Sequence, residues 1–176
     1  HIAIILDGNR RWASQKGLNP WLGHETGAET VDQLLDWCQK LNVKSITLYA
    51  FSTENFRRSK SEIEEIMRLA KENFHEILTD ERIHKNKVRV KVLGRVNLLP
   101  ESLQQLIMDV EKATQSYDEH FLNIAFAYGG RAEIVDAARK IAEKVQEGEL
   151  DPEKVDEQIF EQYLYTSHMS KQDPDL

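Results

Sequence analysis

Short apolar runs along the chain alternate with longer stretches in which apolar residues recur at helical spacing. Four runs of apolar and β-branched character predict strands at residues 2–6, 45–50, 88–93 and 122–127. The run at 2–6 is wholly apolar and breaks sharply at Asp7-Gly8-Asn9, which indicates a strand buried on both faces that enters a tight turn. The pattern therefore supplies four strands for a central sheet.

Helices are predicted between these strands and after the last one, because apolar residues there follow the i, i+3, i+4, i+7 spacing of a helix with one buried face. The marking residues are Val31, Leu34, Leu35, Cys38 and Leu41; Ile63, Ile66, Met67, Ala70, Phe74, Ile77 and Leu78; Leu103, Leu106, Ile107 and Val110; and Ile134, Ala138, Ile141 and Val145. Ser61 and Glu64 form a capping-box pattern for the second helix, which we expect to end near Thr79. The acidic stretch 149–161 predicts a solvated terminal helix.

This order of elements predicts an α/β fold. Strands joined by crossover helices of this length form a mostly parallel central sheet flanked by helices on both faces, and ligands bind at the carboxyl ends of such strands. A length of 176 residues fits one domain, so 1–176 is treated as a single domain.

Composition excludes several classes of protein. With 40% hydrophobic and 30% charged residues the chain is an ordinary globular protein and not a disordered one. The formal net charge is -7 and no basic block is present, which argues against nucleic acid as a partner. No run approaches the roughly 18 apolar residues of a membrane span. The lone Cys38 forms neither an internal disulfide nor a CxxC pair, so we expect a reducing, cytoplasmic location.

Polar residues gather directly after two of the predicted strands. The first group is Asp7-Gly8-Asn9-Arg10-Arg11-Trp12, and the second is Phe51-Ser52-Thr53-Glu54-Asn55-Phe56-Arg57-Arg58. Loop amides and paired guanidiniums bind phosphate, and a carboxylate such as Asp7 can hold a divalent cation. Four arginines on an acidic protein would form a concave positive spot that suits a multiply charged phosphate ligand.

These loops also have purely structural interpretations. Asp7-Gly8-Asn9 can be a capped turn beside two surface arginines, and Glu54 can serve only to neutralise its neighbours. A third loop, Tyr128-Gly129-Gly130-Arg131, is more typical of simple turn chemistry. His24 could donate to a phosphate, although a lone histidine is more often structural. The other histidines show no metal-site spacing.

Three segments together resemble the signatures of one family, the cis-prenyltransferases, which include undecaprenyl diphosphate synthase and dehydrodolichyl diphosphate synthase. They are Asp7-Gly8-Asn9-Arg10-Arg11-Trp12-Ala13 with Gly23-His24, the stretch 49–58, and the stretch 123–131. They stand in the family's order and approximate spacing over essentially the whole chain. The Arg10-Arg11 pair and the stretch 55–62 are more similar to the eukaryotic and archaeal branch than to the bacterial one. The resemblance implies the undecaprenyl diphosphate synthase-like fold.

The resemblance also implies an activity: Mg2+-dependent, sequential cis-condensation of isopentenyl diphosphate onto an allylic diphosphate, farnesyl or similar, which yields a polyprenyl diphosphate for glycosyl-carrier lipids. Asp7 would be the Mg2+ ligand and essential acid. Asn55 would assist proton removal, and because an amide is a poor base it is better pictured as an orienting group. The implied substrate-binding residues are Gly8, Asn9, Arg10, Arg11, Trp12, His24, Ser52, Thr53, Glu54, Phe56 and Arg58. The helix over 61–79 would wall a product tunnel with Ala50 at its mouth.

The chain departs from the family pattern in two places. Pro20 stands where bacterial members have an arginine. The family continues past Leu176 with an Arg-x-Ser-Gly-Glu-x-Arg segment that binds isopentenyl diphosphate, supplies a metal-binding carboxylate and builds a homodimer or a heterodimer with a related subunit. Because the chain begins with His1 rather than Met, we expect it to be a piece of a longer protein. The resemblance implies that this piece holds the allylic half of the site. It also implies peripheral membrane contact for product release.

Two other functions stay open. The first is a non-catalytic accessory subunit, but such subunits have lost the Asp7-Gly8-Asn9 loop that is intact here. The second is an aspartyl phosphatase, which also begins with a buried strand that ends in Asp. That class needs a second Asp where this chain has Asn9.

Overall fold

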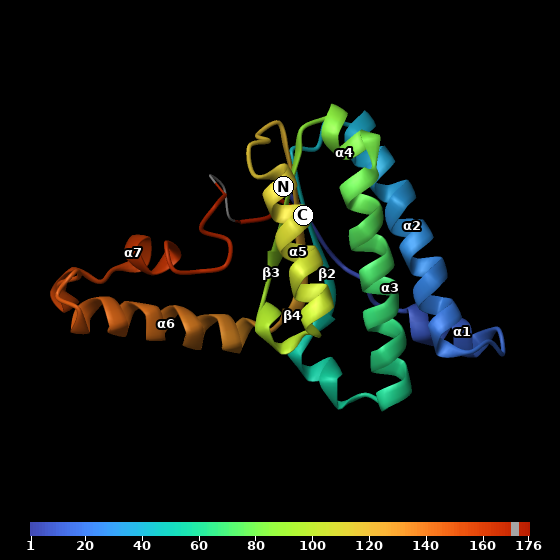
Figure 1. The fold of residues 1–176 in the computed structure, drawn as a ribbon, viewed down its shortest axis with the longest axis horizontal. Coiled ribbons are helices and arrows are strands. Elements are labelled where there is room, and N and C mark those ends of the chain that lie inside the picture. The colour runs from blue at the N-terminus through green and yellow to red at the C-terminus, as the bar shows by residue number, and fades with distance from the viewer. Residues whose placement is uncertain (170–172) are drawn as a thin grey trace.

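The computed structural model describes residues 1–169 and 173–176 (Figure 1). Its strands are β1 (Ile2–Ile5), β2 (Ser45–Ser52), β3 (Val88–Leu93) and β4 (His120–Tyr128). All neighbouring pairs are parallel, and the strand order across the sheet is β1-β2-β4-β3. The prediction of an α/β fold around a parallel sheet is confirmed.

The helices alternate with these strands. They are α1 (Asn9–Gln15), α2 (Pro20–Lys40), α3 (Lys60–Thr79), α4 (Glu81–Lys85), α5 (Glu101–Thr114), α6 (Gly130–Gln146) and α7 (Glu157–Glu161), with short 3-10 helices η1 (Thr53–Arg57), η2 (Val96–Leu98) and η3 (Pro152–Lys154). The capping box predicted at Ser61 and Glu64 is wrong. The cap of α3 is Ser59, whose hydroxyl accepts a hydrogen bond from the Glu62 amide at 3.3 Å.

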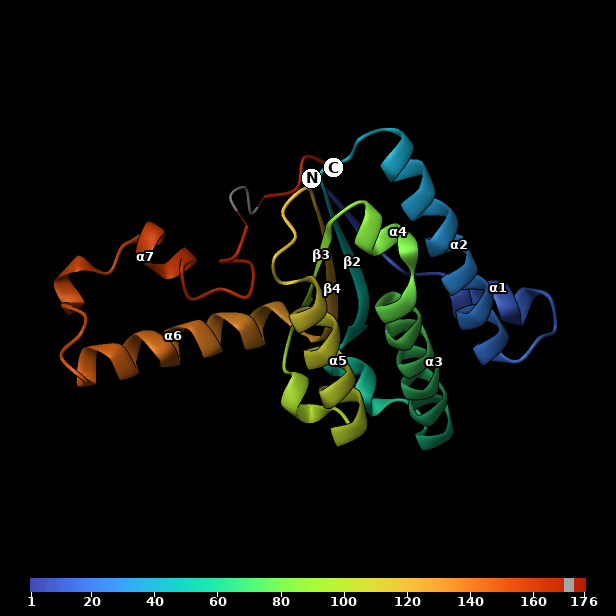
Figure 2. The same ribbon diagram turned by 45° about the horizontal axis from the view of Figure 1, so that its top comes forward.

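The main core lies between one face of the sheet and helices α2, α3 and α5, which cover that face (Figures 1 and 2). Its buried side chains include Leu48, Leu122 and Phe126 from the strands, together with Phe74 of α3 and Ile107 of α5. Burial of each such side chain contributes about 1.5 to 3 kcal/mol. The 3.6-residue periodicity of the sequence therefore identified this face of the three helices, except at Leu41, which follows the end of α2 and is 77% exposed.

The opposite face of the sheet differs from the prediction of helices on both faces. There Asn123 is wholly buried, and its side-chain oxygen lies 2.8 Å from the His168 ring, next to the buried Met169. Helix α6 projects away from the sheet with α7 beside it (Figure 2). The first strand is not buried on both faces as predicted: Ile4 packs against the core, whereas Ile5, which points to the opposite face, is 73% exposed.

Helix α6 also turns a different side inward from the one its apolar spacing predicted. Of the residues predicted to face inward, Ile134 is 56% exposed and Ala138 is exposed, whereas Ile141 is buried as predicted, together with Glu133 and Ala137. The Glu133 carboxylate fixes this rotation, because it accepts hydrogen bonds from the Tyr128 hydroxyl at 2.5 Å and the Tyr165 amide at 2.8 Å.

The acidic stretch 149–161 is not one solvated helix as predicted. After α6 the chain turns at Gly148, which has a positive φ of 74°, and then forms only η3 and the short α7. Asp151 and Asp156 cap these two pieces separately, and Pro152 opens η3. Of the helices within residues 1–169, none combines the length with the apolar character that a bilayer crossing requires.

Candidate active site

The parallel sheet brings the three polar loops of the sequence together. Strand β2 pairs with both β1 and β4, so the loops that follow these strands share one edge. The loop after β4 approaches the loop after β2 so closely that a Cβ at Gly129 would lie 2.6 Å from the Thr53 hydroxyl. A side chain at this position would push the two loops apart. The glycine after β4 therefore supports the site by packing.

The loop after β1 is built on a left-handed glycine. Gly8 has φ 97° and ψ -19°, a conformation that glycine adopts without strain, and it caps α1. The Asp7 carboxylate accepts a hydrogen bond from the Gly8 amide at 2.6 Å and one from the Arg11 guanidinium at 2.8 Å. Its side chain is 73% exposed, so the carboxylate lies at the surface of the site and is accessible to a ligand.

Helix α2 holds this loop in place through a notch formed by two glycines. A Cβ at Gly23 would lie 2.1 Å from the Asn9 carbonyl oxygen, and one at Gly27 would lie 2.4 Å from the Asn9 side-chain nitrogen. Sequence reasoning missed Gly27. The available signal was the four-residue spacing of Gly23 and Gly27 within a helix, where each glycine costs about 1 kcal/mol relative to alanine and so needs a packing reason.

The loop after β2 fixes Asn55 through the backbone. The Asn55 amide donates to the Ser52 hydroxyl at 3.3 Å, and the Ser52 amide donates to the Asn55 side-chain oxygen at 2.9 Å. This reciprocal cap opens η1. The Phe56 ring packs edge-on against the buried Phe51, with 5.0 Å between ring centroids. Asn55 is therefore held in one orientation at the carboxyl end of β2.

A carboxylate that the sequence reasoning missed lies among the predicted phosphate-binding cations. Glu62 of α3 pairs with Arg58 at 2.9 Å, and its oxygens lie 3.9 Å from Arg10 and 3.8 Å from the His24 Nε2. We call Arg10, His24, Arg58 and Glu62 the Glu62 cluster. Burial first, and the Arg58 charge second, lower the pKa of His24, so its imidazole is neutral at pH 7. The i, i+4 spacing from Arg58 to Glu62 was the available signal.

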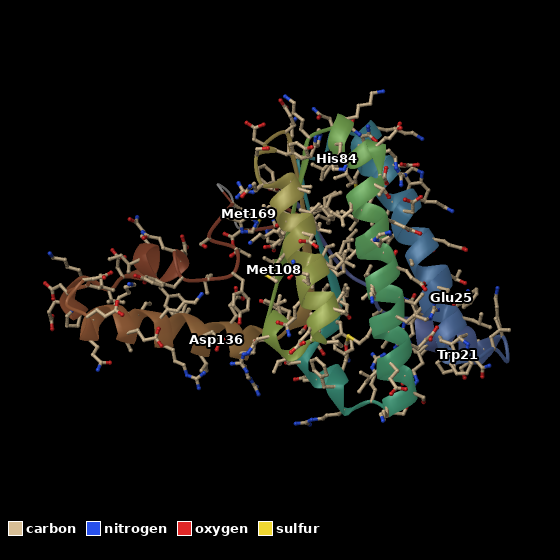
Figure 3. All side chains as sticks on the ribbon, viewed as in Figure 1. Trp21, Glu25, His84, Met108, Asp136 and Met169 are labelled. Atoms are coloured by element: carbon tan, nitrogen blue, oxygen red, sulfur yellow. The ribbon has the colours of Figure 1, made fainter. Side chains whose placement is uncertain are left out.

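A mainly apolar cavity of about 1030 Å³ begins at His24 and Arg58 of this cluster and runs between α2, α3 and the sheet. Asp7, Asn9, His24, Ser52, Glu54, Asn55 and Arg58 line its polar end. Ala50 and the side chains of Ile66, Ala70 and Phe74 line its length, and Asp36, Asp80 and Arg82 lie at the far end. Glu25 of α2 (Figure 3), which also lines the cavity, pairs with Arg68 of α3 at 3.1 Å.

Some predicted residues lie beside the cavity rather than in its wall. Gly8, Arg10, Arg11, Thr53 and the rings of Trp12 and Phe56 are not among the lining residues. The Trp12 ring instead carries the Lys16 ammonium 4.3 Å from its centroid. Within the part of the chain that the structure describes, no three His, Cys, Asp or Glu side chains gather as a metal cluster. Among the residues that line this polar end, Asp7 and Glu54 carry the carboxylates.

A family model described as "Putative undecaprenyl diphosphate synthase" matches residues 5–176. The chain belongs to this family. It is 49% identical over 176 residues to the tritrans,polycis-undecaprenyl-diphosphate synthase (geranylgeranyl-diphosphate specific) of Thermococcus kodakarensis, and 49% identical to the protein of the same name from Methanocaldococcus jannaschii. Each alignment covers all of this chain, which spans 66% and 63% of the length of these two relatives.

Solved structures agree with this assignment. Lavandulyl diphosphate synthase from Lavandula x intermedia, in complex with dimethylallyl diphosphate, has a TM-score of 0.93 and 37% identity, over 99% of this chain and 74% of that one. A probable undecaprenyl diphosphate synthase from Campylobacter jejuni has a TM-score of 0.73 and 32% identity, over 94% and 68%. The family and the fold predicted from the three signatures are confirmed, and the aspartyl phosphatase is excluded.

Proposed function

We propose that this chain is the part of a cis-prenyltransferase that binds the allylic diphosphate, which the enzyme extends by successive cis-condensations with isopentenyl diphosphate. One observation carries the proposal: Arg58 and His24 line the polar end of a mainly apolar cavity of about 1030 Å³, and Arg10 lies beside them on the other side of Glu62. A prenyl diphosphate has the same division, with a multiply charged headgroup and a long hydrocarbon tail. The intact Asp7-Gly8-Asn9 loop favours this function over an accessory subunit.

The headgroup would lie at the polar end. Arg10 and Arg58 are placed to form charge-assisted hydrogen bonds with phosphate oxygens, and His24 adds a neutral donor. Gly8, Asn9 and Arg11 complete the loop around the phosphates, with Trp12 behind it. The names of the archaeal relatives favour geranylgeranyl diphosphate as the primer over the farnesyl diphosphate expected from the sequence.

The hydrocarbon tail would occupy the cavity between α2 and α3. Its wall includes Ile66, Ala70 and Phe74, and Phe56 packs behind the wall through Phe51. Each methylene group that leaves water for such a surface contributes about 0.8 kcal/mol. Addition of each five-carbon unit therefore strengthens binding of the growing chain until the cavity is filled.

The donor set at the polar end suits Mg2+. This ion is usually held by one or two carboxylates together with substrate phosphates and water, and Asp7 offers an exposed carboxylate next to the predicted headgroup position. Asp7 would have to exchange its contact with Arg11 for the ion. When bound, Mg2+ would neutralise charge on the departing diphosphate.

The chain's own residues account for the rest of the proposed chemistry. The carbon–oxygen bond of the allylic diphosphate breaks, a carbon–carbon bond to isopentenyl diphosphate forms, and that unit loses a proton. Arg10 and Arg58 stabilise the negative charge of the leaving diphosphate. Asn55, fixed by Ser52, orients the incoming unit, and the proton leaves to diphosphate or water. Thr53 and Glu54 order this loop, and the apolar wall excludes water.

The remaining parts of the proposal concern the whole protein. The product would be a polyprenyl diphosphate for glycosyl-carrier lipid synthesis, and the archaeal relatives are named for undecaprenyl diphosphate. We propose a cytoplasmic protein that works as a homodimer or with a related subunit. It would contact a membrane peripherally, because the apolar product needs an acceptor when it leaves the cavity. Nucleic acid is not a proposed partner.

The test is incorporation of radiolabelled isopentenyl diphosphate into geranylgeranyl diphosphate by the full-length protein with Mg2+. Asp7→Ala should abolish incorporation without a change in melting temperature, because an exposed loop carboxylate contributes little to packing. Asp118→Ala, an exposed carboxylate in the loop before β4, is the control and should retain activity. Wild-type turnover by Asp7→Ala would remove Asp7 from the mechanism, and an inactive wild-type protein would refute the proposed function.

A further inference from the structure

The carboxylate of Glu62 lies where the proposed headgroup has to make its contacts. Its side chain is only 10% exposed, and it forms the short ion pair with Arg58 at 2.9 Å. Its second oxygen faces Arg10 at 3.9 Å, and its first faces the His24 Nε2 at 3.8 Å. One carboxylate is thus surrounded by three donors that the proposed function assigns to the diphosphate.

These three donors are not equally satisfied by Glu62. The contact with Arg58 has the length of a charge-assisted hydrogen bond, whereas the contacts with Arg10 and His24 are too long for hydrogen bonds. The His24 Nε2 is buried, and no hydrogen-bond partner is found for it within the described chain. A buried polar atom without a partner is costly. The donors are therefore arranged for an anion with more oxygens than a carboxylate provides.

A ligand that contacts Arg58 has to compete with Glu62, which is the hydrogen-bond partner of that guanidinium. The carboxylate is anchored in the first turn of α3, where the Glu62 amide donates to the Ser59 hydroxyl, so it stays close to the site when the ion pair opens. The cluster carries two guanidiniums, a neutral imidazole and one carboxylate, which leaves a single net positive charge. A ligand therefore has to offset the lost contact between Glu62 and Arg58.

Ligands differ in how well they can do this. A phosphate monoester carries a charge of about -1.5 to -2 at pH 7. A diphosphate ester carries more charge and has a second phosphate, so it can contact Arg58 while it also reaches Arg10 and His24. A monophosphate displaces Glu62 from Arg58 and gains fewer of the other contacts. Competition from the Glu62 carboxylate therefore weakens binding of a monophosphate more than binding of a diphosphate.

We propose that Glu62 is a specificity-determining positioning residue, which competes with the ligand for Arg58 and thereby selects a diphosphate headgroup, which can also reach Arg10 and His24, over a monophosphate. The inference rests on the proposed function. It assigns a role to a residue that touches the substrate's binding partners rather than the substrate. It also explains why a nearly buried carboxylate is placed inside a site for anions.

The experiment is calorimetric titration of the full-length protein at pH 7.5 with Mg2+, using geranylgeranyl diphosphate and geranylgeranyl monophosphate. The measured quantity is the dissociation constant of the monophosphate divided by that of the diphosphate. In Glu62→Gln this ratio should fall roughly tenfold, which corresponds to about 1.4 kcal/mol, mainly because the monophosphate binds more tightly. Glu64→Gln is the matched control, because Glu64 is exposed on the same turn and pairs with Lys60 at 3.7 Å. Its ratio should equal that of the wild type.

Two further variants guard against a simple folding effect. Glu62→Met is a second neutral variant with a side chain of similar length. Of Glu62→Gln and Glu62→Met, each variant that keeps the wild-type circular dichroism spectrum should show the lowered ratio of dissociation constants. Glu62→Asp retains the charge and should stay within about threefold of the wild-type ratio, on the scale where tenfold is 1.4 kcal/mol.

The outcomes separate this inference from the proposed function. If folded neutral variants weaken both ligands equally, Glu62 only supports Arg58 and the inference is wrong while the proposed function stands. The same holds if their ratio equals that of the wild type. If the wild-type protein binds neither ligand, the proposed function fails, and the inference fails with it.

Discussion

A substitution at Ala70 on α3 can show whether the cavity beside this helix is an open channel or part of a sealed core. Ala70 is 9% exposed and lines the cavity beside Phe74. The substitution Ala70→Leu adds three carbon atoms at this point. In a close-packed core, such an enlargement costs about 1 to 3 kcal/mol, because neighbouring side chains have to leave their preferred rotamers. In a channel, the added atoms extend into open space.

The size of the cavity makes the expected difference measurable. Three added carbons occupy a small fraction of about 1030 Å³, so we expect Ala70→Leu to change the free energy of unfolding by less than about 0.5 kcal/mol. For a chain of this length that shifts the melting temperature by no more than about 2 °C. Ala137→Leu is the control, because Ala137 is wholly buried in α6 and is not a lining residue. It should lose about 2 to 12 °C.

The second readout is the length of the polyprenyl product, resolved by chromatography after incubation of the full-length protein with geranylgeranyl diphosphate and isopentenyl diphosphate. Ala70→Leu narrows the cavity part-way along α3, so elongation should stop earlier and the mean product should be shorter. The reasoning is refuted if Ala70→Leu is destabilised as strongly as Ala137→Leu and gives products of wild-type length. That result would identify this face of α3 as ordinary core.

Three further predictions follow from the same structure. Phe74→Ala should lengthen the products, whereas Leu103→Ala, which removes a buried side chain outside the cavity wall, should leave their length unchanged. In a urea titration, each variant should lose about 2 to 5 kcal/mol of unfolding free energy. Products of equal length from the two variants would contradict this. Asp136 lies near the sheet end of α6 (Figure 3), where hydrogen bonds from Arg95 lower its pKa from 3.8 to about 2. Its contribution of about 2 kcal/mol to the free energy of unfolding is therefore present at pH 5 and is lost as the pH falls toward 2. Urea unfolding of wild-type protein and Asp136→Asn should therefore differ at pH 5 and converge near pH 2, and a constant difference would disprove the linkage. Burial raises the pKa of the Cys38 thiol, so Ellman's reagent should modify it only as fast as the fold opens; immediate modification of the native protein would show that Cys38 is accessible.

The sequence predicted the features that depend on local pattern. Apolar runs identified all four strands, and the polar loops after β1 and β2 were correctly placed at one edge, because carboxyl ends of parallel strands meet there. Helices α1 and α4 have 7 and 5 residues, too few to show an amphipathic period, and they begin at the caps Gly8 and Asp80 respectively.

Features that depend on tertiary placement were missed. The exposure of Ile5 shows that one face of β1 is left uncovered, which a wholly apolar run does not reveal. The inward side of α6 is set by hydrogen bonds to Glu133 and not by apolar spacing. The Glu62 cluster joins α1, α2 and α3, so the position of its carboxylate is visible only when these helices are placed together.

We propose that one continuous site binds the headgroup at the Glu62 cluster and the tail in the cavity. A crystal structure of the full-length protein with geranylgeranyl thiodiphosphate, a slowly reacting analogue, tests it most directly. We expect the phosphates within hydrogen-bond distance of Arg10 and Arg58, Glu62 displaced from Arg58, and the tail between α2 and α3 alongside Ala70. Phosphates bound away from these arginines, or a tail on the outer surface of the helices, would contradict the account.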